Sequence, residues 1–185
     1  MKKILLILII TFSLQSWTKA DDIIDFEIEG MSIGNSLLDF ISESKIKSLQ
    51  TSYYPNSKKY VRYYEVKDSN IYDAIDAYVL DDDTKFIIHS LSGIIEYTDD
   101  IENCYPKKKE IVKNISESID TKPYNYTADY PNDTSKSNVT DFDLSNGSIR
   151  VFCTDYSKQR EDENYGDFLS VTASTTVFTD WLGTH

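Results

Sequence analysis

The chain has 185 residues, and its 31 acidic residues outnumber its 19 basic ones to give a formal net charge of −12. This size is sufficient for one folded domain with a sizeable core. So acidic a surface repels nucleic acid and anionic lipid, and neither is an expected partner. Cationic partners and divalent cations are favoured instead, unless the charge serves only solubility.

The first twenty residues have the pattern of a secretory signal peptide. Lys2 and Lys3 precede the apolar run 4–14, and small residues at 18 and 20 fit the positions that a signal peptidase reads. The run is too short to span a bilayer. Cleavage after Ala20 would remove three lysines and change the formal net charge from −12 to −15. We therefore expect export to a periplasm or secretion, without stable membrane insertion of the processed chain.

The remaining residues, 21–185, predict a single α+β domain. Hydrophobic residues over 24–28 alternate with charged ones, which is the pattern of a short strand. Ser32 then stands where a helix over 33–42 would begin, because a serine hydroxyl accepts hydrogen bonds from the free N–H groups of a first turn.

Three further strands are expected from hydrophobic patterning, near 60–66, 71–80 and 85–97. Asp81, Asp82 and Asp83 form the turn between the second and third of these. Such hard oxygen ligands suit calcium, although the spacing is not that of an EF-hand loop. Gly93, inside the third strand, predicts a bulge or bend.

The most strongly periodic helix is expected over 101–119. Apolar residues recur there at helical spacing and include Cys104, whereas the lysines, Lys108 among them, are assigned to the solvent-facing side. Residues 120–138 are polar and contain two prolines, which predicts a long surface loop.

A hairpin with a type I′ turn at Asn146-Gly147 is expected next, because alternating hydrophobic residues flank this dipeptide. Cys153 shares the core face of its second strand. The helix stripe and the strand face thus each direct one cysteine inward, which predicts a Cys104–Cys153 disulfide in an exported protein. Two free buried thiols, or a catalytic or metal site, are the alternatives, although a metal site would need more Cys or His nearby.

The C-terminal part predicts three short elements. The charged stretch 157–164 is a loop or one helical turn, Leu169, Val171 and Ala173 mark a last strand, and 177–182 has the pattern of a closing helix. Together the predicted elements give an antiparallel sheet of about five to seven strands with helices packed on one face.

No motif for a nucleophile elbow, zinc peptidase, phosphate loop or dinucleotide is present, so we expect no cofactor and no catalytic residue. His89 lies within a predicted strand, where a hydrogen-bonded structural histidine is expected in place of a general base. The expected function is a binding or interaction module for an envelope protein or a small ligand. The alternatives are a hydrolase of envelope material or glycans that uses two carboxylates, and a calcium-stabilised structural protein.

Gly30-Met31-Ser32 followed by Leu37-Leu38 resembles the opening of small envelope proteins of the BamE/SmpA type. In that family a Gly-Met-Ser/Thr turn caps a short helix, and an antiparallel sheet follows. This chain departs from the family in lacking the lipid-attachment cysteine and in carrying a second hairpin. Its order of elements also resembles exported bacterial proteins of uncharacterised function. The resemblance assigns no functional residue.

Overall fold

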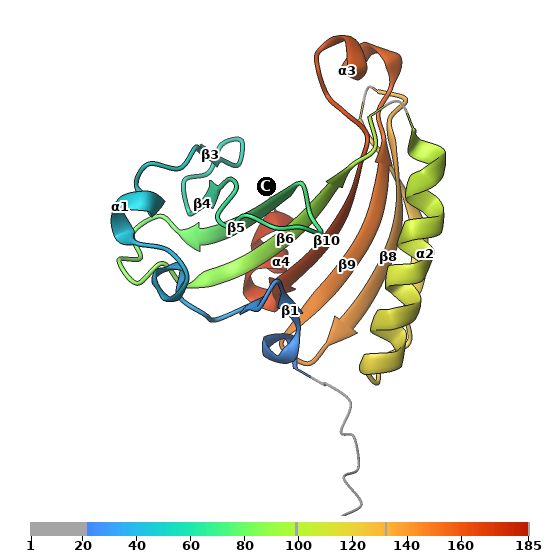
Figure 1. Cartoon of the computed structure of the whole chain (residues 1–185). Coiled ribbons are helices and arrows are strands. Elements are labelled where there is room, and N and C mark those ends of the chain that lie inside the picture. Colours follow the sequence, from blue (N-terminus) through green and yellow to red (C-terminus); the bar gives the residue numbers. More distant parts are fainter. Residues whose placement is uncertain (1–21, 99, 132, 185) are drawn as a thin grey trace, which may run out of the picture.

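The structure, a computed structural model, describes residues 22–98, 100–131 and 133–184. The predicted signal peptide and its cleavage site at Ala20 lie outside the described residues. Within the described ranges, eight strands form one antiparallel sheet in the order β3-β4-β5-β6-β10-β9-β8-β7. The sheet is strongly curved, and α2 runs along its β8–β9 side (Figure 1). The predicted α+β class with an antiparallel sheet and one long amphipathic helix is confirmed, and the sheet is larger than expected.

The large sheet contains β3 (Thr51–Tyr53), β4 (Tyr60–Tyr63), β5 (Ala74–Leu80), β6 (Ile88–Glu96), β7 (Tyr124–Asp129), β8 (Lys136–Leu144), β9 (Gly147–Asp155) and β10 (Phe168–Thr175). A separate hairpin pairs β1 (Glu27–Ile28) with β2 (Met31–Ser32). The helices are η1 (Ile23–Asp25) and η2 (Leu37–Asp39), both 3₁₀, and α1 (Glu43–Ile46), α2 (Ile101–Ser118), α3 (Lys158–Asp162) and α4 (Thr176–Leu182).

The predicted surface loop over 120–138 is wrong in its middle, where β7 pairs with β8 along its whole length. β7 is an edge strand, and nearly all of its residues are exposed. A strand that buries neither face has no hydrophobic alternation, so its polar composition imitates a loop.

The N-terminal expectations are also corrected. Gly34 has φ +86°, which a continuous helix over 33–42 cannot contain. Ser32 belongs to β2, and its N–H donates to the Asn35 side chain at 2.9 Å. Ser36 is the residue that caps, forming a capping box with Asp39 at the start of η2. The predicted strand over 24–28 is reduced to β1, because η1 precedes it.

Two predicted backbone features lie elsewhere. Gly93 keeps the regular register between β5 and β10, and the bulge falls at His89, which has no partner on β5. Gly93 is instead required by packing, since a Cβ there would lie 2.6 Å from the Tyr72 ring. The β8–β9 turn consists of residues 145–146, and no residue in it is among those described with positive φ, so it is not type I′.

One face of the sheet is packed, and we call it the packed face. α2 covers it over β9 and β10, while the N-terminal segment 23–49 covers it over β5 and β6. Its fully buried side chains include Ile75, Ile149 and Leu169. Burying each aliphatic side chain of this size contributes about 1.5–3 kcal/mol, so this face supplies most of the hydrophobic stabilisation.

A disulfide joins Cys104 on α2 to Cys153 on β9, with Cα atoms 6.1 Å apart. Both residues are buried in the core. The bridge closes 49 residues of sequence separation and fixes the long helix to the middle of the sheet.

Lys108 is buried on the same helix, contrary to the solvent-facing position predicted for it. It lies one turn after Cys104, on the stripe that faces the sheet. Its Nζ donates to Asn138 Oδ1 and to Thr140 Oγ1, each at 2.7 Å. Burial lowers the pKa of Lys108 to about 8, partly opposed by the charge of Asp141.

No helix in the described residues is long and apolar enough to cross a membrane.

Candidate functional site

The opposite face of the sheet, which we call the open face, carries polar and aromatic side chains. These positions alternate with the core positions along each strand. Hydroxyl groups pair across strands, with Ser90 Oγ 2.8 Å from Ser174 Oγ and Ser92 Oγ 2.9 Å from Thr172 Oγ1. A sheet with two apolar faces must pack against other elements on both sides. The hydroxyl groups on the open face allow part of that face to contact solvent.

One end of the open face is covered by α4. Phe178 and Trp181 pack on Tyr60, with ring centroids 5.0 and 4.8 Å away, and Phe178 also contacts Tyr78. Thr175 caps this helix through its hydroxyl. The aromatic cluster forms a small second core and leaves the centre of the open face uncovered.

The other end is covered by residues 156–167, which contain α3 and which we call the α3 arch. Arg160 Nε donates to Asp133 Oδ2 at 2.8 Å. Hydrogen bonds from Ser157 and Arg160 hold the pKa of the Asp133 carboxyl well below its usual range. At the base of the arch, Asp167 Oδ1 accepts from Tyr156 N at 2.7 Å. These bonds fix both ends of the arch and its tip.

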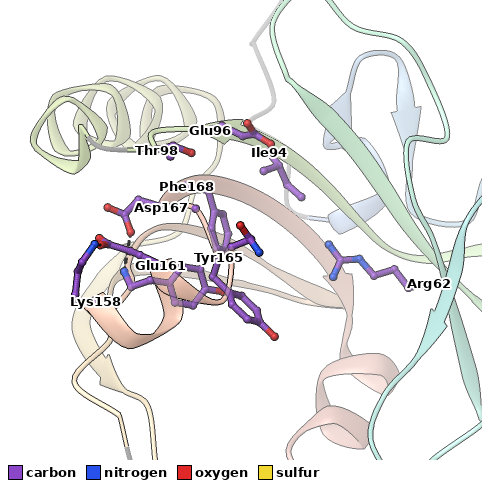
Figure 2. Close-up of a pocket in the computed structure, with 12 residues that line it drawn as sticks. Arg62, Ile94, Glu96, Thr98, Lys158, Glu161, Tyr165, Asp167 and Phe168 are labelled. Carbon is purple, nitrogen blue, oxygen red and sulfur yellow. Dashed lines mark hydrogen bonds and ion pairs between the residues drawn. The ribbon is translucent and has the colours of Figure 1, made fainter.

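The centre of the candidate site is a cavity of about 690 Å³ between the α3 arch and the strands β4, β6 and β10 (Figure 2). This volume is in the range of small-molecule sites. It is lined by Arg62, Ile94, Glu96, Thr98, Tyr156, Lys158, Glu161, Asn164, Tyr165, Gly166, Asp167 and Phe168.

Aromatic rings form the middle of the cavity wall. Tyr156 lies 5.3 Å from Tyr165 and 6.0 Å from Phe168, measured between ring centroids. Burial raises the pKa of Tyr156 to about 12, so its phenol stays protonated at neutral pH. Gly166 packs closely against Thr98, because a Cβ there would lie 2.6 Å from Thr98 Oγ1.

The two cations of the cavity are both engaged with carboxylates. Arg62 Nε donates to Asp76 at 3.0 Å, and its guanidinium lies 4.4 Å from the centre of the Tyr64 ring. Lys158 Nζ lies 3.4 Å from Glu161 and 3.3 Å from Asp162. In Figure 2, Arg62 stands apart from the other charged residues, which gather around the α3 arch and the end of β6.

Glu96 differs from these residues, because no cation among the described residues pairs with it. It ends β6 and is exposed at the rim of the cavity. Asp167 adds a second carboxylate, of which one oxygen accepts from the backbone of Tyr156. The cavity therefore has aromatic walls and an excess of negative charge.

The predicted calcium residues form an ordinary turn. Asp81 accepts a hydrogen bond from the Tyr53 hydroxyl at 2.5 Å, and Asp83 accepts from the backbone N–H groups of Lys85 and Ile87 at 2.8 Å each. Across the described ranges, no group of three or more His, Cys, Asp or Glu residues is placed to hold a metal ion. Asp82 lies between these two turn residues and away from the cavity.

His89 is not the hydrogen-bonded strand histidine that we expected. Its Nδ1 is buried and has no hydrogen-bond partner among the described residues, and its ring packs edge-on against Tyr60 at 5.3 Å. Burial lowers the pKa of His89, opposed by the charge of Asp83. It is not among the residues that line the cavity.

The cavity residues were not predicted from the sequence. The α3 arch was correctly expected as a loop or one helical turn, but its relation to Arg62 and Glu96 depends on the order of strands. One local signal was available, since Tyr156 and Tyr165 flank a charged stretch that has no hydrophobic alternation. Aromatic residues in such a loop indicate packing or binding.

Comparisons with protein-family models, with curated proteins and with solved structures find no match to this chain. The site is therefore interpreted from its own geometry.

Proposed function

We propose that this protein is an exported, disulfide-bonded binding module that holds a small ligand in the cavity beneath the α3 arch. The observation that carries the proposal is the cavity itself. It has a volume of about 690 Å³ and is lined by the rings of Tyr156, Tyr165 and Phe168 together with five charged side chains. This volume lies in the range of small-molecule sites, and the rings give part of the wall the aromatic character of such sites.

The pattern of the first twenty residues and the Cys104–Cys153 disulfide support export. A buried disulfide of this kind persists in an oxidising compartment and is rare in a reducing one. A periplasm or the extracellular space would therefore be the place of action.

A hydrolase that uses two carboxylates is the second candidate, because Glu96 and Glu161 line the same cavity. Glu161 is, however, paired with Lys158, and Asp167 holds the base of the arch. These carboxylates have structural partners that would have to be exchanged during turnover. Binding without turnover does not require these carboxylates to exchange partners, so it explains the geometry more simply.

The test is a screen of small fragments by two-dimensional NMR, with assigned backbone resonances. We expect the hits to shift resonances of the α3 arch and of β6, and Ile94→Trp, which fills the floor of the cavity, to abolish these shifts. Hits confined to other surfaces, or none at all, would overturn the proposal. Turnover of a glycoside or ester fragment that Glu96→Gln abolishes would establish the hydrolase instead.

A further inference from the structure

The charges that line the cavity indicate which class of small ligand it would bind, an inference that rests on the proposed function. Arg62 and Lys158 already face carboxylates, at 3.0 Å for Arg62 to Asp76 and 3.4 Å for Lys158 to Glu161. An anionic ligand would have to compete with those partners. Glu96 has no paired cation among the described residues, so a cationic ligand meets a carboxylate that is available to it.

The aromatic walls favour the same sign of charge. The face of a tyrosine or phenylalanine ring carries negative electrostatic potential and attracts an ammonium group within about 6 Å. Tyr156, Tyr165 and Phe168 are neighbours in the cavity wall, and their mutual angles of 59° and 40° leave the rings tilted rather than stacked in parallel. Tilted rings present faces in more than one direction, as a cage around a cation requires.

The α3 arch already contains one interaction of this type. The Arg160 guanidinium lies 5.1 Å from the centre of the Tyr165 ring. One face of Tyr165 is thus used by the protein, and the rings of Tyr156 and Phe168 have further neighbours in Tyr130 at 6.0 Å and Phe152 at 5.7 Å. The excess of acidic residues over the whole chain, with a net charge of −12, raises the local concentration of cations at any such site.

We propose that the cavity binds an organic cation, a quaternary or alkylated ammonium group on an apolar frame, held by the rings of Tyr156, Tyr165 and Phe168 and by the carboxylate of Glu96. The rings exclude water from the methyl groups of the ligand, and Glu96 at the rim supplies the opposite charge. Arg62 lies at the far end of the cavity, where it would face the uncharged part of the ligand.

The experiment compares choline with 3,3-dimethyl-1-butanol, its uncharged isostere, by isothermal calorimetry and by NMR shift mapping on the full processed chain. Choline is expected to bind at least about fivefold more tightly than the alcohol and to shift the α3 arch and β6. Equal binding of the two probes in the cavity would overturn the cationic class while leaving the binding module intact. If neither probe, nor any fragment of the screen above, shifts the cavity resonances, the binding module fails as well.

Three variants make the test specific. Glu96→Gln should weaken choline about fivefold without changing binding of the alcohol, because only the charge is removed. Tyr165→Leu should weaken choline about twofold, since one side of this ring already holds Arg160. The matched control is Glu117→Gln, which removes the same charge from an exposed position on α2, across the sheet. If Glu117→Gln weakens choline as much as Glu96→Gln does, the effect comes from net charge, and the assigned site is wrong.

Discussion

The two faces of the sheet are made from the same strands and do different work. The packed face is aliphatic, is covered by α2 and by the N-terminal segment, and contains the disulfide. The open face pairs its hydroxyls and aromatic rings and contains the cavity. In this protein, aliphatic burial is concentrated on one side of the strands, and the cavity lies on the other. Period-two alternation is what allows one sequence to serve both.

The open face also contains charges that serve structure. Arg150 donates to both oxygens of Asp141 at 2.8 Å each, and the hydroxyl of Tyr126 donates to the same carboxylate at 3.1 Å. Asp141 is buried, so this network fixes the edge strand β7 to β8 and β9. The cavity is different, because no cation within the described ranges pairs with Glu96, the carboxylate at its rim.

The largest effect is expected from the disulfide of the packed face. Cys104→Ser and Cys153→Ser should each lower the free energy of unfolding by roughly 3–4 kcal/mol, through the loop-closure entropy of the unfolded chain. The double variant should cost about as much as either single one. Urea unfolding under oxidising conditions measures this. Additive losses would show that the two sulfurs do not stabilise the fold as a pair.

The buried lysine of the packed face gives a pH dependence of stability. The folded pKa of Lys108 is about 8, below its ordinary value of 10.5. Between these values the unfolded chain binds a proton that the folded chain has lost, so stability rises with pH. Relative to that of Lys108→Met, the free energy of unfolding of the wild-type protein should increase by about 2 kcal/mol from about pH 8 to about pH 10.

Lys109→Met is the control for this prediction, because its side chain is exposed on the same helix. Its unfolding free energy should follow the wild-type curve across the alkaline range. A Lys108→Met curve parallel to the wild type would mean that Lys108 does not titrate in this window.

A smaller effect is expected from the hydroxyl pair of the open face. Ser90 and Ser174 are both buried, and their Oγ atoms are 2.8 Å apart. Ser90→Ala should cost about 1 kcal/mol, because it leaves the Ser174 hydroxyl buried without this partner. The double variant Ser90→Ala with Ser174→Ala should cost less than the sum of the singles, as thermal unfolding can measure. Strict additivity would argue against the pair.

The smallest effect is expected at His89. Burial puts its folded pKa below the ordinary value of 6.5, so the unfolded chain takes up a proton first on acidification. Stability should therefore decrease as the pH falls through about 6.5, and His89→Gln should lose part of that dependence. Melting temperatures at about pH 7.5 and 5.5 provide the measurement. An unchanged pH response in the variant would assign the dependence to other groups.

Local sequence patterns predicted much of the packed face. Period-two hydrophobicity located β4, β5, β6, β9 and β10, and helical spacing located α2. The predicted inward direction of Cys104 and Cys153 agrees with the disulfide in the structure. These predictions are correct because each helix or strand buries one face, so apolar residues recur in its sequence with the period of that element.

Local patterns failed where a residue's environment comes from a distant element. Lys108 reads as a surface lysine, and only the polar side chains of Asn138 and Thr140, which β8 places beneath α2, make its burial possible. Gly34 is needed for its positive φ, and Gly93 is needed because the Tyr72 ring lies against it. The pattern of hydrophobic residues along the chain indicates neither requirement. β7 was missed because this edge strand buries neither of its faces.

The sequence by itself therefore determined the class of fold, the central strands and the long helix, because each follows from the periodic burial of its own residues. The predicted export depends on a segment that the structure does not describe, and it stays a prediction. The tertiary structure alone decided the cavity. Arg62, Glu96 and Tyr165 come from two strands and a loop, and only the antiparallel order of β4, β5, β6 and β10 brings them to one side of the sheet. Spacing along the chain carries no record of that order, since strand pairing is decided by contacts between segments far apart in sequence.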